Sequence, residues 1–162
     1  MIRDASFSDV PAMIQVLQTA YDSSHYAKSG VVKVDPEAAR QLLMHALWTH
    51  GKTNEGSCFV QVADNGAALT GLIVGTLARV YAIGDKFLAS DLFWVANDGS
   101  SPRDAIGLMR RMLGWAWSSP HVIEVKCGTT AVIDGDPAQA GKILQRLGMS
   151  LYGNLYRMER PA

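Results

Sequence analysis

Hydrophobic residues recur at helical spacing in four segments of the chain, and short apolar runs separate these segments. Helices are therefore expected over residues 6–21, 35–50, 102–118 and 137–147. Ser6 and Asp9 have the spacing of a capping box, and Asp35 before Pro36 is a typical helix start. The polar and aromatic stretch 22–30 is expected to be a loop.

The apolar runs predict six strands, over residues 2–5, 58–63, 69–81, 87–95, 122–127 and 149–158. In the fourth of these, Leu92 and Trp94 point to one face while Phe93 and Val95 point to the other. A strand with two apolar faces is typical of a sheet centre that helices cover on both sides.

An antiparallel meander followed by β-α-β alternation predicts one α/β (α+β) domain over residues 1–162. Its core is expected to be a mixed, mostly antiparallel sheet of six to seven strands, flanked by about four helices.

Charge and cysteine content narrow the class of protein. The 15 basic and 15 acidic residues balance, with no basic stripe of the kind that nucleic-acid binding requires. Cys58 and Cys127 lie far apart, which favours free thiols in a reducing compartment, and no apolar run is long enough to cross a bilayer. The histidines show no ligand spacing. We expect a cytoplasmic protein with no metal, membrane or nucleic-acid partner.

The stretch 91–113 carries the strongest functional signal. An apolar strand runs into a Gly/Ser/Asp loop, and the loop opens directly into a helix. The N-terminus of such a helix has unpaired N–H groups and a partial positive charge, which suit the phosphates of a cofactor. The sequence Ser101-Pro102-Arg103-Asp104 is equally a good start for a helix without a ligand.

The order of elements resembles that of the GNAT superfamily of acyl-CoA-dependent N-acetyltransferases. The opening Ile2-Arg-Asp-Ala-Ser-Phe-Ser-Asp-Val10 is similar to the family's first strand and helix start. Asp91-Leu-Phe-Trp-Val95 with Ala105-Ile-Gly-Leu-Met-Arg-Arg-Met-Leu113 resembles its fourth strand and pyrophosphate-binding helix. Leu144-Gln-Arg-Leu-Gly-Met149 resembles the ending that precedes its last strands.

The resemblance implies that the fourth and fifth strands splay apart and that the pantetheine arm of acetyl-CoA occupies the gap. It also implies an activity, the transfer of an acetyl or other acyl group to a primary amine of a small molecule or protein. The implied cofactor-binding residues are Phe93, Trp94 and Val95 on the strand, and Arg103, Asp104, Ala105, Ile106, Gly107 and Leu108 on the helix. Ala105 and Gly107 are small enough to let a phosphate approach the main chain.

The chain departs from the family pattern at named positions. Pro102 stands where the family has Gln or Arg, and Ala105 stands at the middle glycine. Leu144 stands where the family often has the tyrosine that protonates the departing thiolate. The catalytic candidates are Asp91, as base, and Tyr152, as replacement acid, with Tyr156 and Tyr21 as further hydroxyls for the acid role. Asp91 also suits a structural role as a strand-end cap.

Three interpretations stay open at this point: an acyl-CoA-dependent N-acyltransferase, a catalytically degenerate domain of the same fold that binds CoA or assembles with a partner, and an unrelated α/β domain that binds another anion. In the first, residues 21–26 and 28–33 are expected to line the acceptor side. An exposed tryptophan or the final strand leaves a homodimer open.

Overall fold

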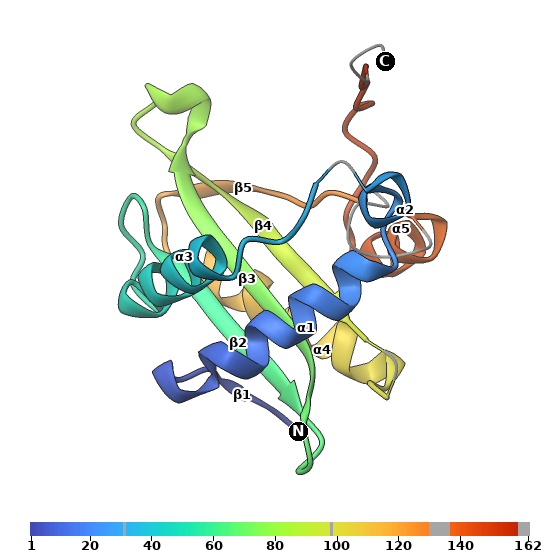
Figure 1. Ribbon diagram of the computed structural model, residues 1–162. Helices are drawn as coiled ribbons and strands as arrows, with labels where there is room; N and C mark the ends of the chain where they lie inside the picture. The colour runs from blue at the N-terminus through green and yellow to red at the C-terminus, as the bar shows by residue number, and fades with distance from the viewer. Residues whose placement is uncertain (31, 98, 130–136, 159–162) are drawn as a thin grey trace.

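In the part of the chain that the structure describes, five strands form one twisted sheet with helices on both faces (Figure 1). The computed structural model describes residues 1–30, 32–97, 99–129 and 137–158. The strands are β1 (Ile2–Asp4), β2 (Cys58–Asp64), β3 (Leu69–Arg79), β4 (Phe87–Ala96) and β5 (Val122–Lys126), and they lie in this order across the sheet. Neighbours from β1 to β4 are antiparallel, whereas β4 and β5 are parallel. The predicted mixed, mostly antiparallel sheet is confirmed.

Helices cover the two faces in separate layers. They are α1 (Val10–Asp22), α2 (His25–Ser29), α3 (Pro36–Trp48), α4 (Pro102–Trp117) and α5 (Pro137–Arg146), with short 3-10 turns at Phe7–Asp9 and Val80–Ala82. Helices α1 and α3 lie on one face, and α4 lies on the other (Figure 1). The four predicted helices are confirmed.

The stretch 22–30 is not entirely a loop, as the sequence predicted, because α2 lies within it. The side chain of Ser24 accepts a hydrogen bond from the Ala27 amide, which caps the start of this helix. Gly30 ends it in the left-handed conformation, with φ of 66°. A helix of five residues is little more than one turn, so it is too short to show an apolar periodicity. Its capping residues determine where it begins and ends.

The predicted final strand over residues 149–158 is wrong, because the structure gives this segment no regular secondary structure. The described sheet therefore has five strands instead of six to seven. An apolar pattern supplies side chains suited to a strand, but a strand exists only where main-chain groups find a neighbour. This segment pairs with no strand among the described residues.

Strand β4 separates two hydrophobic clusters, as its two apolar faces predicted. Phe93 and Val95 pack with the cluster under α1 and α3, whereas Trp94 packs with the cluster under α4. Leu92 departs from the pattern and is 44% exposed. Val74 of β3 pairs with Phe93 while the next residue, Gly75, pairs with Asp91, so Leu92 is a bulge without a partner on β3.

Gly71 marks the closest approach between β3 and β4. A Cβ atom at this position would lie 2.7 Å from the Val95 carbonyl oxygen. We expect Gly71→Ala to lower the free energy of unfolding by about 1–3 kcal/mol, since main-chain atoms have to shift. Gly114 in α4 has no atom within 4 Å of its built Cβ, so Gly114→Ala should instead stabilise the fold by about 0.5–1 kcal/mol. Urea denaturation of both variants tests this contrast, and equal effects would contradict it.

Candidate functional site: a fork between two parallel strands

The strands β4 and β5 pair only over part of their length. The paired residues of β4 are Phe87–Ser90, and β5 ends at Lys126, whereas β4 continues to Ala96. Along 91–96 the edge of β4 has no neighbouring strand on the β5 side among the described residues. The two strands thus form a fork that opens toward the end of β4 (Figure 1). This is the splay that the family resemblance implied.

The register of β3 and β4 determines which amides face the fork. The N–H of Asn97 donates to the carbonyl of Thr70 over 2.8 Å, which continues the β3–β4 register. Alternate residues of an antiparallel strand bond to the same neighbour, so the N–H and C=O of Val95 are also directed to β3. The main-chain groups of Trp94 and Ala96 are therefore directed into the fork.

Of the three β4 residues predicted to bind the cofactor, Trp94 is the one whose main chain faces the fork. Phe93 and Val95 turn their main chains to β3 and their side chains to the cluster under α1. Ala96 was not among the predicted residues. The bulge and the β3–β4 register determine that Ala96 faces the fork, and neither can be recognised in the sequence.

Helix α4 begins beside the open end of β4 and caps its own first turn. The side chain of Ser101 accepts a hydrogen bond from the Asp104 amide at 3.2 Å, and the Asp104 carboxylate accepts from the Ser101 amide at 3.1 Å. Pro102 occupies the first helical position and has no N–H. The indole N–H of Trp94 donates to the Ala105 carbonyl at 3.0 Å, which ties the fork to this helix.

The other predicted residues of α4 lie in different environments. Arg103 is exposed, Ala105 and Ile106 are half-buried, and Leu108 is fully buried in the core. A Cβ atom on Gly107 would collide with the side chain of Ile2. Packing against β1 therefore accounts for the small residue at position 107. The part of α4 that can meet a ligand is its first turn.

Asp91 lies where the strands part. Its carboxylate Oδ1 accepts a hydrogen bond from the Gly128 amide, just beyond the end of β5, at 3.1 Å. Burial raises the pKa of Asp91, while the hydrogen bonds from Gly128 and Cys127 oppose the rise. A carboxyl group with a raised pKa at the base of a fork is a better proton acceptor than an exposed carboxylate, which makes Asp91 a candidate base.

Cys127 is a site residue that the sequence analysis did not identify. Its thiol interacts with Asp91 and lies 3.7 Å from the sulfur of Met109. Burial, with a further contribution from the Asp91 carboxylate, raises the pKa of Cys127 to about 12. The thiol therefore stays protonated at neutral pH and is unsuited to act as a nucleophile. It is suited to donate a hydrogen bond to Asp91.

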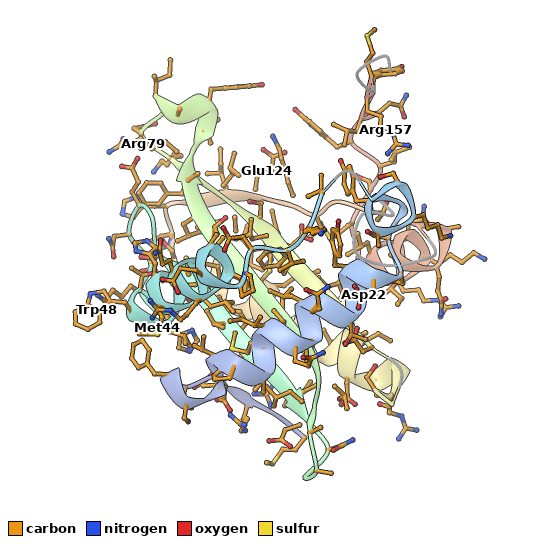
Figure 2. All side chains as sticks on the ribbon, viewed as in Figure 1. Asp22, Met44, Trp48, Arg79, Glu124 and Arg157 are labelled. Atoms are coloured by element: carbon orange, nitrogen blue, oxygen red, sulfur yellow. The ribbon has the colours of Figure 1, made fainter. Side chains whose placement is uncertain are left out.

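Tyr152, the predicted acid, lies on the other side of β5 from Cys127. The ammonium group of Lys126 lies 4.9 Å from the centre of the Tyr152 ring and 3.6 Å from the Glu124 carboxylate. Successive residues of a strand alternate between faces, so Lys126 and Cys127 point to opposite faces. Figure 2 shows Glu124 on a part of the sheet that neither α1 nor α3 covers. The structure therefore does not bring Asp91 and Tyr152 together.

The remaining hydroxyl candidates and Leu144 are also placed. The hydroxyl of Tyr21 donates to the Val32 carbonyl, and Tyr156 is 87% exposed. Leu144 of α5 is buried in the cluster under α4, so an apolar side chain fills the position where the family resemblance implied a tyrosine. Helix α5 contains no Ser, Thr or Tyr, so it brings no hydroxyl group to the fork.

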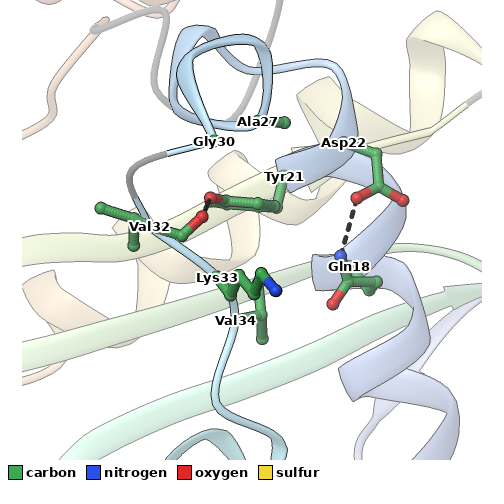
Figure 3. Close-up of a pocket in the computed structure, with 8 residues that line it drawn as sticks. All are labelled: Gln18, Tyr21, Asp22, Ala27, Gly30, Val32, Lys33 and Val34. Atoms are coloured by element: carbon green, nitrogen blue, oxygen red, sulfur yellow. Dashed lines mark hydrogen bonds between the residues drawn. The ribbon is translucent and has the colours of Figure 1, made fainter.

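A shallow pocket of about 350 Å³ lies between α1, α2 and the segment that follows α2 (Figure 3). Most of the lining residues come from α1 and from the segments 21–26 and 28–33 that were expected on the acceptor side, whereas Ala27 and Val34 lie just outside those segments. The residues that line it are Gln18, Tyr21, Asp22, Ala27, Gly30, Val32, Lys33 and Val34. The amide of Gln18 donates to the Asp22 carboxylate at 2.7 Å, and Lys33 lies across the pocket (Figure 3).

The described residues contain no group of three or more His, Cys, Asp or Glu side chains placed to hold a metal ion. Within the same parts of the chain, each helix is too short or too polar to cross a membrane.

The fold matches solved acetyltransferases. An acetyltransferase of Trypanosoma brucei superposes with a TM-score of 0.67 at 8% identity over 99% of both chains. An aminoglycoside acetyltransferase from an uncultured soil metagenomic sample, in complex with sisomicin, gives 0.62 at 15% identity over 100% of this chain and 95% of the other. A transcriptional regulator from Bacillus halodurans gives 0.69 at 14% identity over 99% of both chains.

No protein-family model and no curated protein sequence matches the chain. At the identities above, the structural matches show the fold. This chain has the fold of GNAT acetyltransferases. Because a transcriptional regulator shares that fold, the chemistry has to be argued from the fork itself.

Proposed function

We propose that this protein transfers an acetyl or other acyl group from acyl-coenzyme A directly to a primary amine of a small molecule or protein. The observation that carries the proposal is the open edge of β4, whose Trp94 and Ala96 main-chain groups face the fork. Unpaired strand edges bind extended ligands through main-chain hydrogen bonds. A pantetheine arm, with its two amides, has the chemistry to act as that strand.

The residues of the fork fit this donor well along β4 and less well at α4. The edge of β4 supplies both donors and acceptors for the pantetheine amides. The first turn of α4 supplies a helix N-terminus for the diphosphate, with Arg103 exposed beside it. The Asp104 carboxylate occupies the same turn and adds a negative charge there. We therefore assign most of the binding of acyl-coenzyme A to the edge of β4.

The thioester, when bound, supplies an activated carbonyl carbon and a thiolate leaving group. Asp91 is the base that removes a proton from the acceptor amine, with Cys127 and Gly128 holding its carboxylate in place. The Ala96 or Trp94 amide stabilises the carbonyl oxygen as it gains charge. Tyr152 is the remaining candidate for returning a proton to the thiolate, from the face of β5 that carries Lys126.

The pocket of Figure 3, on the side of the molecule that carries α1 and α2, is assigned to the body of the acceptor. Its reacting amine then has to extend through the fork to Asp91, because the Cys127 thiol that contacts Asp91 packs on the α4 side of the sheet. Asp22 offers a carboxylate to a cationic amine, and Tyr21 offers an aromatic wall. Gly30 and Val32 also line this pocket.

Two measurements test the proposed function. Acetyl-CoA at about a hundred times its dissociation constant should stabilise the fold by about 2.7 kcal/mol, seen as a rise in melting temperature. Release of free CoA thiol in the presence of a panel of primary amines should then detect turnover. A melting temperature that stays constant at millimolar acetyl-CoA contradicts the proposal.

A second candidate function is a non-catalytic domain that still binds CoA. Leu144 favours it, because this buried side chain has no proton to give at the position where the family resemblance implied a tyrosine. Stabilisation by CoA without thiol release across the amine panel would select this function. Thiol release that requires an amine would select the enzyme.

The charge of Asp104 gives a direct prediction about the donor. Asp104→Asn keeps an oxygen that can accept from the Ser101 amide but removes the negative charge from the first turn of α4. We expect CoA to bind about two- to five-fold more tightly at low salt, corresponding to about 0.3–1 kcal/mol. Isothermal titration with CoA measures the change. S-acetylpantetheine, which lacks the diphosphate, is the matched control and should bind both proteins equally.

A further inference from the structure

The last row of β4–β5 pairing lies at the mouth of the fork. In this row Ser90 of β4 pairs with Lys126 of β5 on one side and with Thr76 of β3 on the other. Ala89 of β4 is buried in the cluster under α4, so Ser90, the next residue of the strand, points to the opposite face. The side chains of this row therefore lie on the face that carries α1, α3 and the pocket of Figure 3.

Two neighbours hold the ammonium group of Lys126 over this row. Its Nζ lies 4.9 Å from the centre of the Tyr152 ring and 3.6 Å from Oε2 of Glu124. The second separation is that of an ion pair and is longer than an N–H···O hydrogen bond. The Lys126 side chain is 38% exposed, and its ammonium donates no hydrogen bond to any residue that the structure describes. Its N–H donors are therefore available to a ligand.

The charge at the mouth of the fork is positive on this face. Glu124 lies two positions earlier on β5, where it pairs with Leu88 in a row further from the fork. The row at the mouth carries the Lys126 ammonium beside the hydroxyl groups of Thr76 and Ser90, whose oxygens lie 3.2 Å apart. Figure 2 shows Glu124 on a part of the sheet that α1 and α3 leave uncovered, so a ligand has access to this face.

This positive charge discriminates between acceptor amines. An acceptor whose body lies in the pocket of Figure 3 has to pass this row to bring its amine to Asp91. Lys126 disfavours the protonated form of that amine, since like charges repel, and it equally disfavours an acceptor that is only a cation. A carboxylate on the acceptor removes this penalty, because it accepts hydrogen bonds from the ammonium and from the hydroxyl groups.

We propose that the acceptor is an amino acid, whose carboxylate Lys126 binds with Ser90 and Thr76 as further hydrogen-bond partners. The assignment rests on the proposed acyl transfer and narrows its acceptor from primary amines in general. In the reaction, the amine nitrogen forms a bond to the acyl carbon and the carbon–sulfur bond breaks. The proton of the nitrogen passes to Asp91, and the thiolate takes up a proton and leaves as free CoA.

Matched pairs of acceptors test the assignment. Glycine, β-alanine and L-lysine differ in the distance from amine to carboxylate, and each is compared with its carboxamide, which keeps the amine and loses the negative charge. We expect the acid of at least one pair to exceed its amide in kcat/KM by about 10- to 100-fold in the parent chain. The ratio of acid to amide is then compared between variants, so that the different basicity of the two amines cancels.

Three variants identify the residue that sets this ratio. Lys126→Gln should abolish the preference by weakening the acids alone, whereas Lys126→Arg, which keeps the charge, should retain it. Lys52→Gln is the matched control, because Lys52 is exposed and precedes β2, three strands from β5. This control should leave the ratio unchanged. Melting temperatures near that of the parent chain show that each variant is folded.

A binding measurement distinguishes failure of this assignment from failure of acyl transfer. Isothermal titration of the same acids into the protein, with and without saturating CoA, needs no turnover. Weaker binding to Lys126→Gln than to the parent chain and to Lys52→Gln supports the assignment even if no thiol is released. Acids that neither bind nor react, or a preference for acids that survives in Lys126→Gln, would overturn it. Release of CoA thiol with the amides alone would overturn the assignment and leave the acyltransferase function standing.

Discussion

Asp91→Asn is expected to lower kcat by about 10²–10⁴ while leaving acetyl-CoA affinity unchanged. Asn keeps the oxygen that accepts from the Gly128 amide, so the anchor at the base of the fork survives and the proton-accepting charge is lost. Steady-state kinetics with saturating amine measures kcat, and the CoA-induced rise in melting temperature measures binding. Unchanged turnover would make Asp91 a structural anchor between β4 and the end of β5.

The pH profile gives an independent measure of the same residue. Because burial raises the pKa of Asp91, its ionised form accumulates at a higher pH than that of an exposed aspartate. The acidic limb of kcat/KM should therefore lie above the usual pH for an aspartate. Cys127 lowers the pKa through its hydrogen bond, so Cys127→Ala should move the limb to still higher pH, and Cys127→Ser should restore it. If the acidic limb lies at the same pH in both variants as in the parent chain, Cys127 does not influence the pKa of the catalytic base.

The positions of helices and central strands follow from periodicity along the chain. The two apolar faces of β4 correctly predicted its position between two helix layers. A strand that is buried on both faces needs apolar side chains at successive positions, and this pattern is visible in the sequence. The strand at 149–158 failed for a reason of the same kind. Its apolar residues satisfy a strand pattern, but pairing depends on an edge that another part of the fold, or another molecule, has to present.

The fork was predictable as a region and less so as a set of atoms. A single bulge at Leu92 changes which amides of β4 face the fork and which face β3. No residue type in the sequence indicates that a bulge occurs there. Cys127 lies 36 positions from Asp91 in the chain, so their contact exists only after β5 aligns with β4. Gly107 illustrates the converse, because a small residue serves equally for a ligand or for the packing of Ile2.

The two parts of the fork differ in how far the protein satisfies its own main-chain groups. The helix N-terminus is partly satisfied by its own Ser101 and Asp104, which favours a stable α4 over an open anion cradle. The edge of β4 has no such internal partner among the described residues. A donor that binds here is therefore held chiefly by main-chain hydrogen bonds, which depend little on salt. The affinity for acetyl-CoA should accordingly change little between low and physiological ionic strength.

Two proline substitutions on β4 test whether its main chain holds the donor. The Ala96 amide faces the fork, so Ala96→Pro removes a donor to the ligand without removing a bond to β3. Val95 before it already has extended geometry, which proline tolerates in the preceding residue. We expect a folded protein whose kcat/KM for acetyl-CoA falls about 10- to 100-fold.

Val95→Pro is the matched control one position earlier. Its amide is directed to Leu72 of β3, so proline removes a ladder bond inside the sheet and should cost about 3 kcal/mol or more of stability. Circular dichroism separates the two outcomes, since Ala96→Pro should retain a cooperative unfolding transition and Val95→Pro should lose or weaken it. If Ala96→Pro folds and turns over like the parent chain, the donor does not bind along β4, and the fork is not the acyl-donor site.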